Sequence, residues 1–220
     1  MRPLKEQHPR QGSVAGEKLI VFVKAPRPGA VKTRLAAAMG AEPACAAYGR
    51  MVATLFHQLQ GLSTVELCFT PQDAADEIRR WLQEGWTSSP QGNGDLGRRL
   101  QTAFERSFAA GAGRVVVIGS DCPAVTTRDI FQAWQGLRTN DVVLGPATDG
   151  GYWLIGLRQV QPDLFQAIPW STERVFAETL KRIRQRSLSV QILRELSDLD
   201  TEADWRAFLA ARRNGDGTKT

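Results

Sequence analysis

The sequence has little cysteine and no long apolar run, and both absences exclude classes of protein. Its three cysteines, Cys45, Cys68 and Cys122, lie far apart and form no Cys-x-x-Cys pair. We therefore expect reduced thiols rather than a disulfide framework or a zinc site. No stretch approaches the roughly 18 consecutive apolar residues that cross a membrane, and the polar N-terminus contains no apolar signal region. These observations favour a cytoplasmic protein with no membrane partner.

Histidine is also scarce, which argues against a Ser-His-Asp hydrolase. The two histidines are His8, in the polar N-terminal segment, and His57, in a predicted helix where a surface or core-edge role is expected. Because no histidine is paired with it, Cys122 is expected to be a small buried thiol rather than a nucleophile.

The overall composition is that of an ordinary globular domain. The 220 residues are 42% hydrophobic and 23% charged, and these values exclude a disordered or low-complexity chain. A chain of this length forms one domain. We expect a single domain at residues 18–212 and flexible tails at residues 1–17 and 213–220, and the sequence leaves a homodimer open.

The positive charge of the chain is concentrated near its start. The net charge of +5 first suggests nucleic acid, but residues 1–40 contain 8 basic and 2 acidic residues, whereas residues 41–220 contain 20 and 21. Residues 18–40 contain five cations and no acid. They lack the interleaved aromatic and basic residues of many RNA or DNA modules. We therefore expect a site for one phosphorylated small molecule and no nucleic-acid partner.

Apolar runs alternate with amphipathic segments along the chain. This alternation predicts a three-layer α/β/α sandwich with a mainly parallel sheet. Ligands bind such sheets outside the carboxyl ends of the strands, and the polar loops 24–34, 119–123 and 194–201 follow three of the predicted strands. The predicted strands are 18–24, 64–70, 114–119, 140–144, 152–157 and 188–193, and the predicted helices are 31–39, 42–60, 72–83, 95–110, one around 130–137, 172–186 and one after residue 201.

The first of these loops carries four cations, Lys24, Arg27, Lys32 and Arg34. It joins a buried strand to the start of a helix, where free backbone N–H groups and the helix dipole favour an anion. Arg34 can bind two phosphate oxygens at once, and the lysines act as point charges. The loop is not a Walker A motif, because Val31 stands where that motif has glycine. We expect it to bind a diphosphate or triphosphate, and the alternative is a solvated basic loop.

Carboxylates follow two other predicted strands. Asp121 ends an apolar strand, and Asp198 and Asp200 follow the last strand, where alternation points them the same way. Oxygen ligands of this kind suit Mg²⁺ or Mn²⁺, so Asp121, Asp198 and Asp200 are the candidate metal ligands. The alternative for Asp121 is a turn cap. Thr201 and Asp204 are explained by capping of the last helix.

A glycine-rich segment, Gln-Gly-Asn-Gly-Asp-Leu-Gly, precedes the predicted helix at 95–110 and contains Gly94 and Asp95. Asp95 is a candidate N-cap, and the glycines allow close approach of a flat ligand such as a nucleobase. The alternative is a plain turn without a ligand.

The turn at 145–151 lies between two predicted strands and carries Asp149 beside paired glycines. Asp149 is a candidate general base for an acceptor hydroxyl, and the alternative is a hairpin turn with its aromatic neighbours in the core. Ser171 or Thr172 is expected to cap the helix that follows. The candidate acceptor pocket consists of Thr148, Gly150, Tyr152 and Trp170.

Five motifs occur in order along the chain: F-V-K-A-P-R-P-G-A-V-K-T-R-L-A at 22–36, G-N-G-D-L-G-R-R-L at 92–100, G-S-D-C-P at 119–123, G-P-A-T-D-G-G-Y-W-L-I-G-L at 145–157 and D-L-D-T-E-A-D at 198–204. With them, the chain from Lys18 to about Phe208 resembles a bacterial family of GT-A-type glycosyltransferases with the nucleotide-diphospho-sugar transferase fold. Some members are labelled arsenosugar-biosynthesis glycosyltransferases. The first and last motifs are also similar to those of phospholactate guanylyltransferases and, more distantly, of molybdenum-cofactor nucleotidyltransferases.

The resemblance implies roles for the cations and for the glycine-rich segment. Lys24, Lys32 and Arg34 would hold the phosphates of a donor. Gly94 and Asp95 would lie near its base.

The resemblance also implies that Asp121, with Asp198 or Asp200, binds the metal. The segment Ser120-Asp121-Cys122 lacks the Asp-x-Asp spacing of many GT-A enzymes. The complete set of metal ligands therefore stays open.

Together these features predict a transferase dependent on Mg²⁺ or Mn²⁺ that takes a nucleotide-sugar donor and a small-molecule acceptor. Asp121 and Asp149 are the candidate catalytic residues. One alternative is a nucleotidyltransferase that takes a nucleoside triphosphate and a phosphorylated small molecule and releases pyrophosphate. A second alternative is a phosphometabolite-binding module without catalysis.

Overall fold

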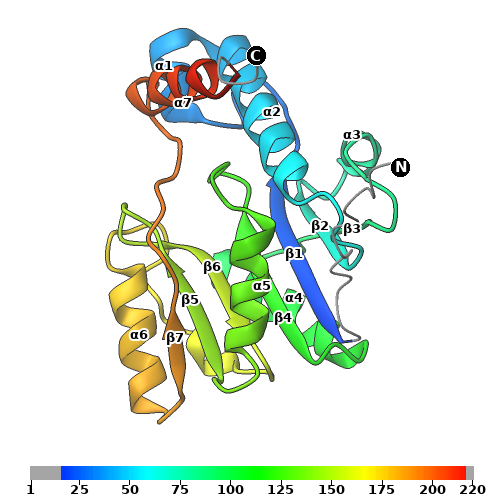
Figure 1. Ribbon diagram of the computed structural model, residues 1–220, viewed down its shortest axis with the longest axis vertical. Coiled ribbons are helices and arrows are strands. Elements are labelled where there is room, and N and C mark those ends of the chain that lie inside the picture. Colours follow the sequence, from blue (N-terminus) through cyan, green and yellow to red (C-terminus); the bar gives the residue numbers. More distant parts are fainter. Residues whose placement is uncertain (1–15, 217–220) are drawn as a thin grey trace, which may run out of the picture.

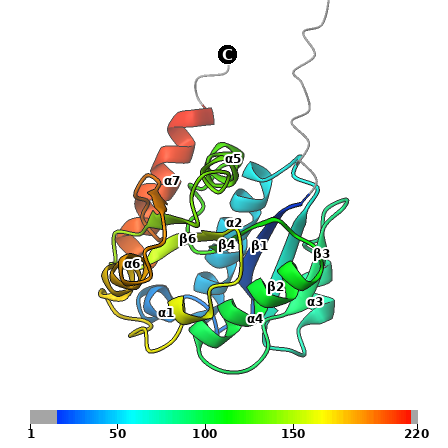
Figure 2. The ribbon, with the colours of Figure 1, turned by 90° about the horizontal axis from the view of Figure 1, so that it is seen from below.

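The computed structural model of the protein describes residues 16–216, with side chains to residue 211. Its centre is a seven-stranded sheet with helices on both faces (Figures 1 and 2), which confirms the predicted three-layer α/β/α sandwich. The strands are β1 (Glu17–Lys24), β2 (Val65–Thr70), β3 (Thr87–Pro90), β4 (Arg114–Gly119), β5 (Val142–Pro146), β6 (Tyr152–Leu157) and β7 (Val190–Ile192).

The strand order is β3-β2-β1-β4-β6-β5-β7. All neighbouring strands are parallel except where β6 pairs with β4 and with β5, so β6 alone runs the other way. From β1 the chain continues to β2 on one side, while β4 lies on the other side. The loops that leave the carboxyl ends of β1 and β4 therefore diverge, and a crevice opens between them.

The helices divide between the two faces of the sheet, as Figure 2 shows. The first hydrophobic cluster joins the sheet to α2, α3 and α5, and the second joins it to α4 and α6. The helices are α1 (Thr33–Met39), α2 (Ala41–Gln58), α3 (Ala75–Arg79), α4 (Leu96–Ala109), α5 (Thr127–Gly136), the 3-10 helix η1 (Pro162–Leu164), α6 (Val175–Gln185) and α7 (Glu202–Asp216).

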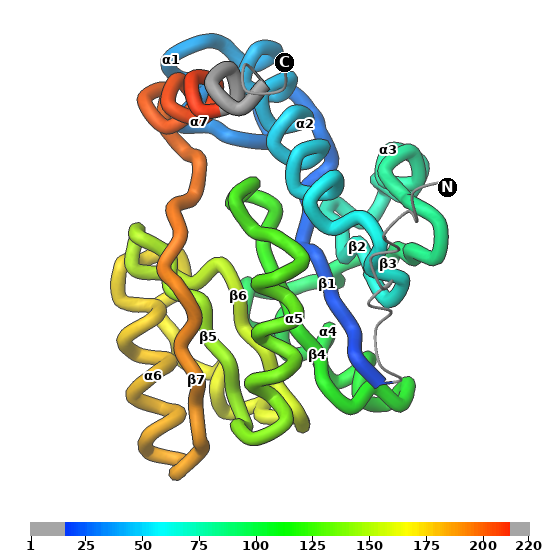
Figure 3. Tube along the Cα trace, in the orientation of Figure 1, coloured from blue at the N-terminus to red at the C-terminus, as the bar shows by residue number. Residues whose placement is uncertain are grey.

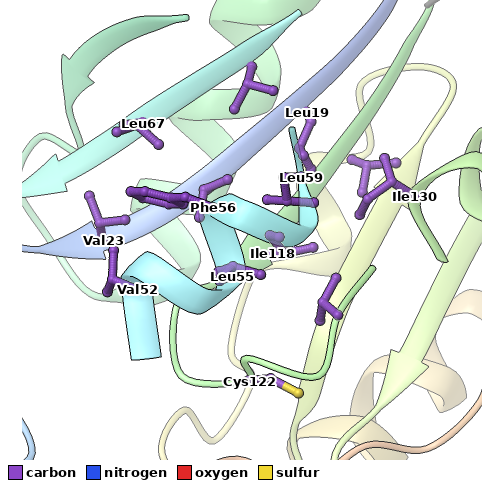
Figure 4. Packing of buried hydrophobic residues seen from close by; sticks show 14 of the residues in the cluster. Leu19, Val23, Val52, Leu55, Phe56, Leu59, Leu67, Ile118, Cys122 and Ile130 are labelled. Atoms are coloured by element: carbon purple, nitrogen blue, oxygen red, sulfur yellow. The ribbon is translucent and has the colours of Figure 1, made fainter. Parts of the chain in front are cut away.

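The alternation of side chains along β1 builds both halves of the core. Leu19 and Val23 point toward α2, where Val52, Leu55 and Phe56 cover them (Figure 4). Ile20 points to the other face of the sheet and belongs to the second hydrophobic cluster, which includes residues of α4. Both faces of β1 are therefore buried, as its uninterrupted apolar sequence predicts. Each large apolar side chain that is fully buried contributes about 1.5–3 kcal/mol.

Two elements differ from the prediction. The strand β3 was not expected, because its sequence, Thr-Ser-Ser-Pro, is polar; it forms as an edge strand that pairs only with β2. The helix expected at 72–83 is confined to α3. Residues after α3 turn more tightly, with the Trp81 N–H bonded to the carbonyl of Ile78, and this turn lets Trp81 and Leu82 pack against the core.

The helices α1 and α7 lie side by side beyond the carboxyl ends of β1 and β4 (Figures 1 and 3). A third hydrophobic cluster holds them together, in which Leu199 and Trp205 meet Leu35 and Met51. An extended segment, residues 193–201, runs from β7 to this helical pair (Figure 3). Thr201 and Asp204 cap the start of α7 as predicted.

The expected tails fall largely outside the described residues, since 1–15 and 217–220 are not described. At the two boundaries β1 begins at Glu17, and α7 continues to Asp216. None of the helices within residues 16–216 is both long enough and apolar enough to span a membrane.

An ion pair between a buried carboxylate and a half-exposed arginine attaches the extended segment to the rest of the fold. Asp129 is 3% exposed and accepts hydrogen bonds from Nε and Nη2 of Arg194, both at 2.7 Å. The same carboxylate closes the capping box of α5 with Thr126. Burial raises the pKa of Asp129, but the bonds from Arg194 and Thr126 outweigh burial and hold this pKa below its usual value.

Replacement of Asp129 by asparagine is expected to lower the free energy of unfolding by about 2 kcal/mol at neutral pH, because Arg194 loses its carboxylate and α5 part of its cap. Since the folded-state pKa is lowered, this contribution exists above about pH 4 and disappears as the pH falls through the folded-state value. Urea unfolding should therefore show a gap between the two proteins at pH 7 that narrows at pH 3. Asp76→Asn, at an exposed pair with Arg79, is the control and should change little; an equal loss in both variants would contradict the assignment.

Candidate functional site

A cavity of about 620 Å³ lies at the edge of the sheet where β1 and β4 end and the antiparallel β6 begins. The residues around it come from all three polar loops predicted from the sequence, 24–34, 119–123 and 194–201. The loop between β3 and α4 and the loop before α6 complete its walls. The cavity therefore occupies the crevice that the strand order predicts.

Four aspartates line this cavity, Asp121, Asp149, Asp198 and Asp200, and Glu173 lines it as well. The backbone N–H of Leu199 donates to the carbonyl of Asp121 at 3.0 Å, and this bond sets Asp198 and Asp200 beside Asp121. Burial, followed by the charges of Asp121, Asp149 and Asp200, raises the pKa of Asp198 to about 7, although Lys32 opposes the rise. The structure thus brings together the three predicted metal ligands and Asp149.

Lys32 lies inside this carboxylate cluster. Its Nζ is 2.6 Å from Oδ1 of Asp121 and 2.8 Å from Oδ1 of Asp200, and its side chain is 3% exposed. Burial lowers the pKa of Lys32, but the two carboxylates outweigh burial and leave this pKa above its usual value. Lys32 also adopts a left-handed backbone conformation, with φ of 47°, at the start of α1. That turn aims the side chain inward, so Lys32 balances the charge of the acidic residues.

Lys24 and Arg34 line the cavity and are exposed. The end of β1 that carries Lys24 is fixed by Tyr48 of α2, whose hydroxyl accepts a hydrogen bond from the backbone N–H of Lys24 at 2.9 Å. The same hydroxyl lies 2.9 Å from Oγ of Ser120 and so joins the ends of β1 and β4. Nothing in the sequence distinguished Tyr48 from the core residues of its helix.

Arg27 does not line the cavity, in contrast to Lys24 and Arg34. Its guanidinium turns toward the far side of the loop, where Nη2 is 2.6 Å from Oε1 of Glu77 and 3.2 Å from Oδ1 of Asp73. The bonds to these carboxylates, Glu77 before Asp73, raise the pKa of Arg27. Arg27 therefore attaches the first loop to α3.

The glycine-rich segment contributes to the cavity through residues other than those predicted. Asp95 caps α4 by accepting the N–H of Arg98 at 2.8 Å, which confirms the capping prediction, but neither Gly94 nor Asp95 lines the cavity. Gln91 and Arg99 line it instead. Gln91 is a strand-end polar residue and Arg99 lies in the first turn of an amphipathic helix, and neither position alone signals a ligand.

The turn between β5 and β6 is a hairpin connection, as the alternative interpretation of 145–151 predicts. Its Asp149 nevertheless lines the cavity, with Oδ1 accepting the N–H of Gly151 at 2.8 Å. Tyr152 and Trp170 also line the cavity and meet edge to face, with ring centroids 6.4 Å apart. Thr148 lies outside the lining and faces Oγ of Ser197 at 3.2 Å.

The loop before α6 packs directly on this turn. The N–H of Phe176 donates to the carbonyl of Gly150 at 2.9 Å, and a side chain at Gly150 would overlap the backbone of Glu173. Gly150 therefore shapes the cavity wall although it does not line it. The helix begins at Val175, so the predicted cap at Ser171 or Thr172 is wrong: the chain stays irregular there, and Ser171 has a φ of 64°.

Cys122, which also lines the cavity, is the inert thiol that the sequence predicts. It is 1% exposed. Burial, aided by the nearby charge of Asp198, raises the pKa of its thiol to about 12. A thiol held protonated in this way is a poor nucleophile.

The chemistry of the acidic residues fits a hard divalent cation. Asp121, Asp198 and Asp200 offer carboxylate oxygens, the ligands that Mg²⁺ and Mn²⁺ prefer. The ammonium of Lys32 bridges Asp121 and Asp200. Within the described residues no three such side chains converge closely enough to hold a metal as they stand, so water or substrate oxygens would have to complete the coordination of any metal.

The chain has the nucleotide-diphospho-sugar transferase fold, and its cavity lies at the carboxyl ends of the parallel strands. A crystal structure from Desulfovibrio desulfuricans G20, described as a "putative nucleotide-diphospho-sugar transferase", is 32% identical to the chain, with a TM-score of 0.86 over 94% of this chain and 92% of that one. The chain belongs to the family described as "Uncharacterized protein conserved in bacteria (DUF2064)", whose model matches residues 54–172. Both findings confirm the resemblance predicted from the motifs.

Two more distant structures share the fold. A CMP:2-keto-3-deoxy-manno-octonic acid synthetase in complex with CTP is 12% identical, with a TM-score of 0.58 over 91% of this chain and 100% of that one. A 4-diphosphocytidyl-2C-methyl-D-erythritol synthase from Anaerococcus prevotii DSM 20548 is 10% identical, with a TM-score of 0.58 over 89% and 99% of the two chains. A comparison with curated proteins finds no significant match.

Replacement of Gly150 by alanine is expected to destabilise the protein by about 2–4 kcal/mol, because the added methyl group overlaps the backbone of Glu173 in a conformation that already disfavours alanine. Gly92→Ala is a matched control, since Gly92 has a similar φ of 81° and open space around the position of a Cβ atom. Its cost should be confined to backbone strain, about 1 kcal/mol. Chemical denaturation of both variants measures the difference in the free energy of unfolding. Equal decreases in the two variants would show that the loop before α6 moves aside without cost.

Proposed function

We propose that the protein is a transferase that binds a nucleotide-sugar donor in the cavity of about 620 Å³ and transfers the sugar to a small-molecule acceptor. The observation that carries this proposal is the meeting of acidic and basic groups at the strand-order reversal. Asp121, Asp198 and Asp200 lie there beside Lys32, with Arg34 near Asp200 at 3.8 Å. Such a combination suits a diphosphate shared between cationic side chains and a divalent metal. Residues 18–212 act in this proposal as one transferase domain.

Asp121 with Asp198 and Asp200 would hold the metal, either Mg²⁺ or Mn²⁺. A bound divalent ion neutralises charge that develops on a leaving diphosphate. Lys24 and Arg34 bind phosphate oxygens from the open side of the cavity, where their side chains are exposed. The donor is thereby oriented with its diphosphate at the carboxylates and its sugar toward β6.

Asp149 faces the part of the cavity where Tyr152 and Trp170 form an aromatic wall. In the transfer step, the hydroxyl oxygen of the acceptor forms a bond to the anomeric carbon while the bond from that carbon to the diphosphate breaks. The electron pair leaves with the nucleoside diphosphate, and Asp149 accepts the proton of the hydroxyl. The aromatic wall excludes water from this reaction.

The comparisons support a transferase that uses a nucleotide. The relative from Desulfovibrio desulfuricans, at 32% identity, is described as a nucleotide-diphospho-sugar transferase. The fold alone is shared with the synthetase that was determined in complex with CTP.

Asp121→Asn is expected to remove the metal-dependent part of nucleoside diphosphate binding, because the amide keeps the shape of the carboxylate but not its charge. Calorimetry with and without Mg²⁺ or Mn²⁺ should show that added metal increases the affinity of the wild-type protein about tenfold or more and leaves the variant unchanged. The control is Asp76→Asn. Asp76 forms an exposed ion pair with Arg79 and lies outside the cavity lining, so this variant should behave as the wild type. Metal-dependent binding that survives in Asp121→Asn would overturn the assigned site.

Nucleotidyl transfer is the second candidate, favoured by a specific observation. A hollow of about 390 Å³ is lined by Lys24, Lys32 and Arg34, together with the carboxylates Asp121 and Asp200. Three cations around a space of this size suit the pyrophosphate that such a reaction releases from a nucleoside triphosphate.

The products separate these candidates. Incubation with nucleotide sugars should release a nucleoside diphosphate, whereas incubation with nucleoside triphosphates and a phosphorylated acceptor should release pyrophosphate only if the second candidate holds. Arg34→Ala should then reduce turnover by about tenfold or more through lost phosphate contacts. Tight nucleotide binding without either product, across acceptors, would favour a binding module and contradict both transfer reactions.

A further inference from the structure

Arg99 occupies a fixed position on the wall of the cavity. Its Nε donates to the carbonyl oxygen of Gly94 at 2.9 Å, and its Nη1 donates to Oε1 of Gln91 at 3.2 Å. Among the described residues no carboxylate forms an ion pair with Arg99, whereas most of the arginines that do pair hold a carboxylate within 3.2 Å. Two of the five guanidinium N–H groups are used, so the remaining donors are available to a ligand.

Gln91, which positions Arg99, has no amide hydrogen left for a ligand. The residue is 6% exposed. Its Nε2 donates to the carbonyl of Val23 at 3.2 Å and to the carbonyl of Cys68 at 3.0 Å, while its oxygen accepts from Arg99. The side-chain groups that this part of the wall presents to a ligand are therefore the N–H donors of Arg99.

The side chains that line the cavity with Arg99 are otherwise apolar on this side. Phe22 and Val23 come from β1, and Leu96 comes from the first turn of α4 and is 38% exposed. The lining aspartates instead come from the loops after β4, β5 and β7, while Lys24 is the last residue of β1 and Arg34 lies in the first turn of α1. An apolar surface with one rigid set of donors suits the ring of a nucleobase better than a further phosphate group.

We infer that Arg99 selects a nucleobase that carries a ring carbonyl and discriminates against adenine. This inference rests on the proposed function, because it requires a nucleotide in the cavity. A guanidinium donates two parallel hydrogen bonds to neighbouring acceptors such as O6 and N7 of guanine, and uracil and cytosine also offer carbonyl oxygens. Adenine presents an amino group beside N7, and this donor faces the donors of Arg99.

The test measures the affinities of GDP, UDP, CDP and ADP for the whole protein by calorimetry in the presence of Mg²⁺. The affinity for the best of the three carbonyl-bearing nucleotides should be at least about ten times the affinity for ADP. Two hydrogen bonds from one arginine to one base give a discrimination of this size. In Arg99→Ala the affinity for the preferred nucleotide should fall to the affinity for ADP, and the affinity for ADP should stay unchanged. Arg99→Lys keeps the charge but not the paired donors, and it should lose the preference as well.

Arg98→Ala is the matched control, because Arg98 is exposed, neighbours Arg99 and lies outside the cavity lining. It removes the same charge and should keep the preference. The inference is overturned if wild-type protein binds ADP as tightly as the others, a result that needs no variant to fold. It is also overturned if Arg99→Ala weakens all four nucleotides equally, since Arg99 is then a phosphate contact. Binding of none of the four would instead contradict the proposed function itself.

Discussion

The acidic half of the site depends on how one irregular segment is attached to the sheet. Residues 193–201 leave β7 and cross to α7 without pairing as a strand along most of their length. Two contacts fix them to the part of the chain that follows β4: the ion pair of Arg194 with Asp129 of α5 and the bond from Leu199 N–H to the carbonyl of Asp121. The docking of Trp205 and Leu199 on the α1 and α2 side provides the third attachment. Together with the backbone bonds of Leu196 to Pro146 and Thr148, these contacts set the position of Asp198 and Asp200 relative to Asp121.

Bringing four carboxylates to one cavity has an electrostatic cost, and the structure offsets part of it. Like charges and burial raise the pKa of Asp198, which means that the folded chain resists its ionisation. The buried ammonium of Lys32 compensates Asp121 and Asp200. Charge clusters that do not stabilise a fold are common at binding sites, where a ligand relieves the repulsion. The arrangement is therefore better explained by binding than by stability.

Much of the fold could be predicted from the sequence because its strands are apolar on both faces and its helices amphipathic. The runs that became β1 and β4 admit no other interpretation, and a mainly parallel sheet places the loops after them at one edge. The polar strand β3 could not be predicted, because pairing with β2 defines it rather than its own residues. The early end of α3 could not be predicted either, because it depends on the packing of Trp81 against α2 and its neighbours.

The candidate site also contains residues that could be predicted from the sequence and residues that could not. Residues that follow strands directly, such as Asp121, were found because strand ends locate them. The direction of a long side chain depends on partners far away in the sequence. Arg27 turns to Glu77 and Lys32 turns into the carboxylates, while Arg99 is aimed by Gln91. None of these pairs is visible in a local motif.

The bond between Lys32 and Asp200 joins residues 168 positions apart. Contacts of such separation form late in folding, because the entropy of closing the intervening chain has to be overcome by structure that already exists. The sheet and its two helical layers can be complete while the site is still open on one side. During synthesis the candidate site is therefore incomplete until residues 198–200 have been made, and before then Lys32 has Asp121 but not Asp200 as a partner.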